Sequence, residues 1–173
     1  MSISNSSQCI KTDHSSPESD RGIFHFTEAE IIASEKVNLP HGLHGLSNTN
    51  HFAFLSPSET SLKPFKVLYN LDNPAISFIV LPGEAFNGFA LRYEDKAKVA
   101  DTYNIDADNL KVIYLVRILK KDDELGMTAN LRAPIIIDWG RKLAWQHILE
   151  SSEFQFDFPL KDFFATLHKH KDD

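Results

Sequence analysis

The sequence predicts an all-β fold: one small antiparallel β-barrel-like domain with one or two short helices. From residue 22 onward, short apolar segments alternate with turn residues at close intervals, which is typical of all-β proteins. Two charged, glycine-containing links, KKDDELGM at 120–127 and DWGRK at 138–142, each join two strong apolar runs and indicate hairpins. A chain of 173 residues with 42% apolar side chains can fill one core, and two full domains are not expected.

The apolar segments define eight expected strands. Their ranges are 52–55, 65–71, 75–81, 88–93, 110–119, 131–137, 143–150 and 153–158. In the last range Phe154, Phe156 and Phe158 alternate with polar residues, which predicts one buried and one exposed face. A helix is expected at 94–103, ended by Asn104, with a further turn at 106–109.

The two ends of the chain differ from this pattern. Residues 1–21 are rich in serine and poor in large apolar side chains, so we expect a disordered leader before a domain spanning 22–159. For residues 160–173 we expect a short C-terminal helix or tail. Its apolar residues have helical spacing: Leu160, Phe163, Phe164 and Leu167. So short a helix must dock, either by packing on the barrel or by covering a partner groove from which it is displaced.

Composition restricts the partners and the compartment. The chain carries 18 basic and 24 acidic residues, a net charge of −6, which disfavours direct nucleic-acid binding and suits a basic protein partner. Cys9 is the single cysteine, so an intramolecular disulfide and a cysteine metal cage are excluded. No signal peptide and no apolar run of about 18 residues is visible, so we expect a cytoplasmic protein without membrane contact.

Catalytic apparatus is not evident in the sequence. The serines lack a nucleophile-elbow context, and the spacing of His41, His44 and His51 matches no zinc site. We therefore expect a non-enzymatic binding protein without a metal or another cofactor. The alternative is a small-ligand-binding or enzymatic β-barrel, which would need convergent polar groups on strands that offer mainly Ile, Val, Leu and Phe.

The run TANLRAPIII at 128–137, followed by Gln146, supplies the candidate partner-binding residues. Asn130 and Arg132 enter an apolar strand, either to satisfy internal hydrogen bonds or to face a partner. Pro134 lacks a ladder donor and marks a strand start, an edge or a bulge, and an edge can accept a partner strand. Trp139 lies on a turn, where it folds back onto the barrel or contacts a partner.

Two turns are also expected from residue type. Gly42 and Gly45 supply positive φ in a tight turn. Asp72 and Asn73 bond their own backbone beside Pro74, which fixes φ in a second turn. For all five turn positions a partner contact is the minor alternative.

In order and spacing, three segments resemble the landmarks of the flagellar assembly factor FliW family. They are LPHGLHGL at 39–46, NLDNPAISFIV at 70–80, and TANLRAPIII with Gln146, and the match covers 37–156. The resemblance implies a cytoplasmic β-barrel-like protein that binds the translational repressor CsrA and the filament protein flagellin. Free factor would sequester CsrA, and accumulating flagellin would capture the factor and restore repression. Leu46 and Ser47 after Gly45, and Phe154, depart from the usual family pattern, and both ends of the chain exceed the usual family length.

Overall fold

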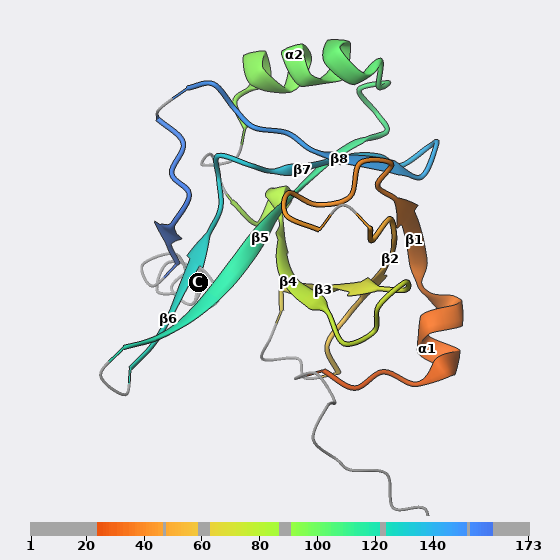
Figure 1. Cartoon of the computed structure of the whole chain (residues 1–173). Coiled ribbons are helices and arrows are strands. Elements are labelled where there is room, and N and C mark those ends of the chain that lie inside the picture. Colours follow the sequence, from red (N-terminus) through yellow and green to blue (C-terminus); the bar gives the residue numbers. More distant parts are fainter. Residues whose placement is uncertain are drawn as a thin grey trace, which may run out of the picture.

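Seven strands form a closed barrel (Figure 1). The computed structural model describes residues 24–46, 48–58, 63–86, 91–121, 124–151 and 153–160. The barrel strands are β1 (Glu35–Asn38), β2 (His51–Leu55), β3 (Lys66–Asn70), β4 (Ser77–Pro82), β5 (Leu110–Lys121), β7 (Ile135–Asp138) and β8 (Leu143–Gln146). Their order is β4-β3-β2-β1-β8-β7-β5, and pairing of β5 with β4 closes the ring. The predicted all-β barrel is thereby confirmed.

The ring is antiparallel except at one junction. β1 and β8 run parallel and meet at a single register pair, Asn38 with Leu143, beside a hydrogen bond from the Asn38 N–H to the Lys142 carbonyl (2.9 Å). This short contact joins the first and last barrel strands. Closure removes the free edges that an open sheet would present to other chains.

Strand β5 is longer than the barrel requires. Its first residues pair with β7, its middle with β4, and its last with β6 (Glu124–Ala129). The paired ends of β5 and β6 therefore project from the barrel as an arm, which points to the lower left in Figure 1. The sequence placed a connecting link at 120–127, but both strands run through most of it. The charged residues at 120–127 did not indicate that these segments pair as strands. Strands that project beyond the barrel do not have to bury one face, so they lack the apolar alternation that marks a strand in a sequence.

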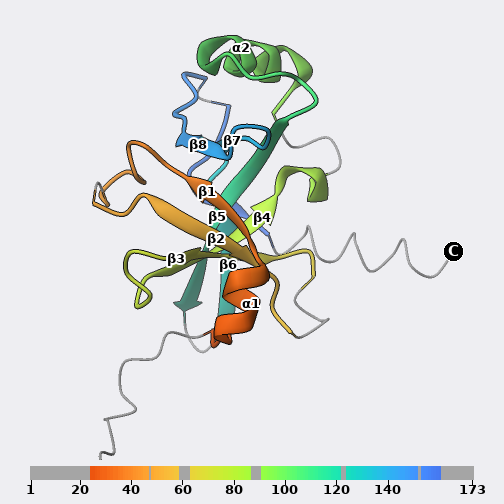
Figure 2. The same ribbon diagram turned by 90° about the vertical axis from the view of Figure 1, so that its right-hand side faces the viewer.

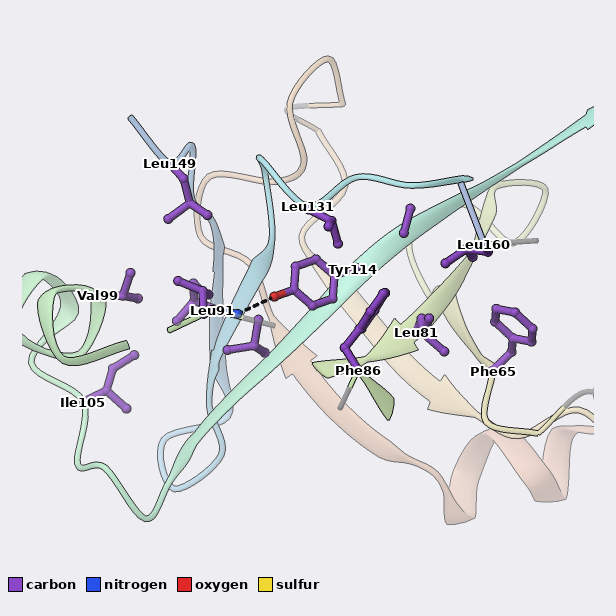
Figure 3. Packing of buried hydrophobic residues seen from close by; sticks show 13 residues of the cluster. Phe65, Leu81, Phe86, Leu91, Val99, Ile105, Tyr114, Leu131, Leu149 and Leu160 are labelled. Atoms are coloured by element: carbon purple, nitrogen blue, oxygen red, sulfur yellow. Dashed lines mark hydrogen bonds between the residues drawn. The ribbon is translucent and has the colours of Figure 1, made fainter. Parts of the chain in front are cut away.

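Apolar side chains form two cores, one on each side of the barrel wall. Alternate residues of all seven barrel strands point inward and form the barrel core: Val37, Phe52, Leu68, Val80, Ile113, Ile135, Ile137 and Ala144. The opposite faces of β4, β5, β7 and β8 contribute to a second cluster, the outer core, shown in Figure 3. Within it the Leu91 N–H donates to the Tyr114 hydroxyl (3.1 Å), and burial raises the pKa of Tyr114 to about 12.

Helix α2 (Tyr93–Tyr103) covers one end of the outer core, above β7 and β8 in Figures 1 and 2. Its side chain Val99 is buried there, and the Tyr103 ring stacks on Trp145 with 4.7 Å between centroids. Asn104 ends the helix with φ of 51°, and the Asn109 N–H bonds to the Asp106 carbonyl (2.9 Å), as the sequence predicts. In the described part of the chain no helix is both long and apolar enough to cross a membrane.

A second helix, α1 (Glu28–Ala33), was not predicted. Its N-terminus is a capping box in which the Thr27 hydroxyl accepts from the Glu30 N–H, while the Glu30 carboxylate accepts from the Thr27 N–H. The four letters TEAE carry this signal. None of the helix residues is buried, so no apolar stripe marked the helix in the sequence.

Several predicted strands were wrong in extent. Strand β1 was not expected at all, and the run at 153–158 forms a strand only at its end, as β9 (Phe158–Pro159). The segment expected at 88–93 ends in the first residue of α2, and 87–90 lie outside the described residues. The strand expected over 131–137 begins only at Ile135, and the one at 143–150 stops at Gln146. The predicted leader and tail also lie outside the described residues, apart from Leu160.

The two predicted turns are present, but Asp72 acts differently from the expectation. Gly42 and Gly45 have φ of 65° and 87°. The Asp72 carboxylate accepts from the N–H groups of Asn50 (2.7 Å) and His51 (2.9 Å), so it fastens a neighbouring strand rather than its own turn. These backbone hydrogen bonds, first that of His51, lower the pKa of Asp72 to about 2. In the same turn the Asn73 side chain accepts from Ala75 N–H (3.3 Å), as expected.

Asp72 should make the stability of the barrel depend on acid. Because its pKa falls from 3.8 to about 2 on folding, the stabilisation is complete above pH about 4 and is lost as pH falls toward 2. We expect Asp72→Asn to lower the melting temperature at pH 7 and to show a smaller loss of melting temperature between pH 5 and pH 2. Thermal melts across this range measure the difference. Parallel curves for the two proteins would contradict this role.

Candidate partner-binding site at the Asn130 to Pro134 bulge

The candidate residues Asn130, Arg132 and Pro134 lie in a bulge between β6 and β7. Both strands pair with the same edge of β5, β6 through Ala129 opposite Val116 and β7 through Ile135 opposite Ile113. The five residues 130–134 therefore face only the two β5 residues 114 and 115. The excess chain loops out from the barrel wall.

The bulge is built from internal hydrogen bonds and two apolar anchors. The Asn130 N–H donates to the Leu115 carbonyl (2.9 Å), and the Asn130 side-chain oxygen accepts from the Ala133 N–H (2.9 Å). Leu131 and Ala133 are buried in or beside the outer core. Pro134 follows, buried and directly before β7, where its missing N–H costs no ladder bond.

A later segment of the chain satisfies the remaining backbone groups of the bulge. The N–H groups of Leu131 and Arg132 both donate to the Gln155 carbonyl, at 2.9 and 3.2 Å. In return, the Arg132 carbonyl accepts from Leu149 N–H (2.8 Å), and the Pro134 carbonyl accepts from His147 N–H (2.9 Å). The bulge therefore fixes the path of residues 147–155 across the barrel wall.

Gln146 links the bulge to the glycine turn. Its side-chain oxygen accepts from the His44 N–H (2.9 Å), and its amide nitrogen donates to the Ala133 carbonyl (3.4 Å). The first and third sequence landmarks thus meet through one side chain. Gln146 has a structural role in this position.

Trp139 folds back onto the barrel. Its ring lies 5.6 Å from the Phe54 ring, and the Lys142 ammonium stands 4.1 Å above it. In the same hairpin, burial of Asp138 opposes ionisation, but hydrogen bonds from the Arg141 N–H and guanidinium hold its pKa below the usual range. The β7–β8 hairpin is therefore stabilised from within.

Phe156 faces outward in this region, with the half-buried Arg132 beside it. The Arg132 guanidinium lies 5.1 Å from the centre of the Phe156 ring, which is 57% exposed. Among the described residues the buried Arg132 Nε has no hydrogen-bond partner. Phe156 also lines an open groove of about 650 Å³. Other residues of this groove are Phe78, Leu115, Val116, Arg117, Thr128, Asn130 and Asp157.

The sequence motif contains Asn130, Arg132, Pro134 and Gln146, which do lie in one region, but it gives no sign of the groove or of Phe156. Trp139 lies apart, on the β7–β8 hairpin against the barrel core. Phe156 was assigned to the buried face of a strand with Phe154 and Phe158. Its neighbours do pack on the outer core, whereas Phe156 turns away toward the groove. No signal in the sequence separates these three aromatic residues.

The described residues include no cluster of three or more metal-ligating side chains. His51 instead pairs with Asp72, its Nδ1 lying 2.9 Å from the carboxylate. Burial lowers the pKa of His147, whose Nδ1 lies 3.0 Å from the Tyr103 hydroxyl. These histidines have partners within the fold.

The fold is thus a closed β-barrel whose wall carries a hydrogen-bonded bulge and an outward aromatic–cation pair beside a groove. A family model described as FliW protein matches residues 23–160. The chain belongs to the FliW family. The match spans the whole barrel, the bulge and the segment that bears Phe156.

Individual relatives agree with this assignment. A flagellar assembly factor FliW from Caldanaerobacter subterraneus subsp. tengcongensis is 29% identical over 150 residues, covering 86% of this chain and 94% of the relative. Another, from Clostridium botulinum, is 31% identical and covers 73% of this chain and 86% of the relative. A crystal structure of the flagellar assembly factor FliW has the same fold, with a TM-score of 0.58 at 20% identity over 79% of this chain and 89% of that one.

Asn130 offers a test of how the bulge is held. Asn130→Ala removes the acceptor of the Ala133 N–H, and we expect it to lower the free energy of unfolding by about 1 kcal/mol. Asn130→Asp keeps an acceptor oxygen at the same place and serves as the matched control, which should lose less. Chemical denaturation measures both. Equal stability of the alanine variant and the unaltered protein would contradict the internal role of this side chain.

Proposed function

We propose that this protein is a non-catalytic cytoplasmic regulator of flagellar assembly that binds a CsrA-type translational repressor and flagellin. The relatives are named flagellar assembly factors, and they align with most of this chain. The family resemblance of the landmark segments implies the two partners. In this mechanism free protein antagonises the repressor, and flagellin competes for the protein as a chaperoned client.

The observation that carries a binding role is the Arg132–Phe156 pair beside the groove. The Gln155 carbonyl accepts two hydrogen bonds from the bulge. These bonds hold the backbone beside Phe156, so the position of Phe156 does not depend on burial of its ring. Exposed aromatic and arginine side chains on a rigid backbone are the residue types that dominate binding energy in protein interfaces. We therefore place the partner contact at the groove, with Asn130 and Arg132 at its edge.

Charge supports a basic protein partner. Residues 22–160 hold 13 basic and 18 acidic residues, a net charge of −5. Such a field attracts a basic RNA-binding protein and repels phosphate. The groove itself carries both signs through Arg117 and Asp157, so the long-range attraction comes from the rest of the surface.

An enzymatic or ligand-binding barrel is the less favoured function. In the described part of the chain, apolar side chains from all seven barrel strands fill the barrel core. A substrate inside the barrel would have to displace that packing. The groove outside is bordered by one arginine, one aspartate, one threonine, one asparagine and apolar side chains, an arrangement better suited to a protein surface than to acid–base chemistry.

The net negative charge of the domain predicts how binding should respond to salt. We expect the purified chain to bind the repressor dimer of its own host, and the affinity to fall between about 0.05 and 0.5 M salt, mainly through a slower association rate. The flagellin mRNA leader alone should not bind. Surface plasmon resonance with repressor, flagellin and leader RNA measures all three. Binding to neither protein, or tight salt-sensitive binding to the RNA alone, would refute the proposed function.

The lining of the groove predicts which side chains contribute to the affinity for a partner. Phe156→Ser should leave the melting temperature nearly unchanged and weaken binding of at least one partner more than about tenfold. Arg132→Ala should lower affinity and, through the lost contact with Phe156, also lower the melting temperature slightly. Tyr93→Ser is the matched control, because this aromatic ring on α2 is 87% exposed and lies outside the groove. Full affinity of Phe156→Ser for both partners would place the contact elsewhere.

A further inference from the structure

The outer core continues onto the projecting arm as an exposed apolar strip. Alternate residues of β5, ending with Val116, belong to the outer core, so Ile118 is the next residue on that face. Its cross-strand partner is Met127, which packs partly against the same core. Ile118 nevertheless remains 45% exposed. The strip formed by Ile118 and Met127 lacks full cover from the described residues.

The described chain ends beside this strip and points along it. β9 runs antiparallel to β6, pairing Phe158 with Ala129 and Pro159 with Thr128. The Leu160 N–H then donates to the Met127 carbonyl (2.9 Å), and the Leu160 side chain is fully buried in the outer core, near Leu81 and Phe65 in Figure 3. A chain that continues in this direction moves toward the tip of the arm.

Thirteen residues follow Leu160, and their pattern fits the strip. Leu160, Phe163, Phe164 and Leu167 have the spacing of one helical face, and Leu160 already faces the outer core. Seven helical residues span about 10 Å. The three strand residues from Met127 to the start of β6 also span about 10 Å, so the two lengths agree.

We propose that residues 161–173 dock on the arm strip and cover Ile118 and Met127 with Phe163 and Phe164. The family match ends at residue 160, so this cover is an addition to the part of the chain that the family model matches. Covered in this way, the strip of Ile118 and Met127 is no longer available for contact with a second copy of the chain. The proposal concerns contacts within one chain and does not rest on the proposed function.

Site-specific cross-linking in the full chain tests the contact. The photoreactive residue p-benzoylphenylalanine takes the place of Phe164, whose ring it extends, and mass spectrometry maps the cross-linked peptides. We expect a cross-link to the peptide containing Ile118 or Met127 within the same molecule, with a yield that does not change with protein concentration. The same photoreactive residue in place of Tyr93, on α2, serves as the control and should not reach the arm.

Two arm variants make the test specific. Ile118→Ser on the covered face should lower the cross-link yield several-fold. Leu119→Ser, on the opposite face of the same strand and 37% exposed, should leave it unchanged. Cross-linked dimers that increase with concentration would mean that a second copy occupies the strip, and cross-links outside the arm would mean that the tail docks elsewhere. Either result, or equal effects of the two serine variants, overturns the proposal.

Discussion

The architecture depends on one strand with more partners than a barrel strand normally has. At its two edges β5 must pair with β4, β6 and β7, and β6 and β7 share the edge opposite β4. A continuous chain can place two strands end to end on one edge only if the linking residues leave the ladder. The bulge at 130–134 is that departure, and its freed backbone groups then need other acceptors and donors. Residues 147–155 supply them, which brings the following segment across the outer core and on to β9.

The three segments that carry the family resemblance are connected physically as well as by spacing. Gln146 joins the bulge to the glycine turn through the Ala133 carbonyl and the His44 N–H. Asp72 joins the second landmark to the strand that follows the same glycine turn, through two backbone N–H groups. Residues that look like a binding motif in the sequence therefore include several whose polar atoms serve the fold. An interface on this protein has to use side chains that these links leave free.

The strongly periodic apolar segments of the sequence were enough to predict a barrel. The strands that were missed or given wrong bounds have physical explanations. Strand β1 has the sequence EKVN and buries only Val37 fully, so pairing with β2 and β8 rather than composition makes it a strand. The run TANLRAPIII keeps apolar residues within the bulge, because Leu131 and Ala133 are buried in the core. These residues made the sequence look like one strand and concealed the break between β6 and β7. The alternation of Phe154, Phe156 and Phe158 suggested one strand face, yet Phe154 and Phe158 pack on the outer core and Phe156 lines the groove. The groove depends on tertiary placement of β4, β5 and the 156–157 segment, which no local pattern contains.

The bulge explains how an exposed aromatic residue is kept in place without being part of a core. Residue 155 is held through its carbonyl by two N–H groups of the bulge, so the position of Phe156 is set by the backbone and by the arginine that stacks on it. A ring presented in this way is already ordered, and a partner that buries it gains apolar contact at a small cost in conformational entropy. The same hydrogen bonds connect residue 155 to Leu131 and Arg132 of the bulge. From the bulge, Gln146 extends this series of contacts to the glycine turn. The segment that bears Phe156 and the glycine turn are therefore both fastened to the bulge by hydrogen bonds.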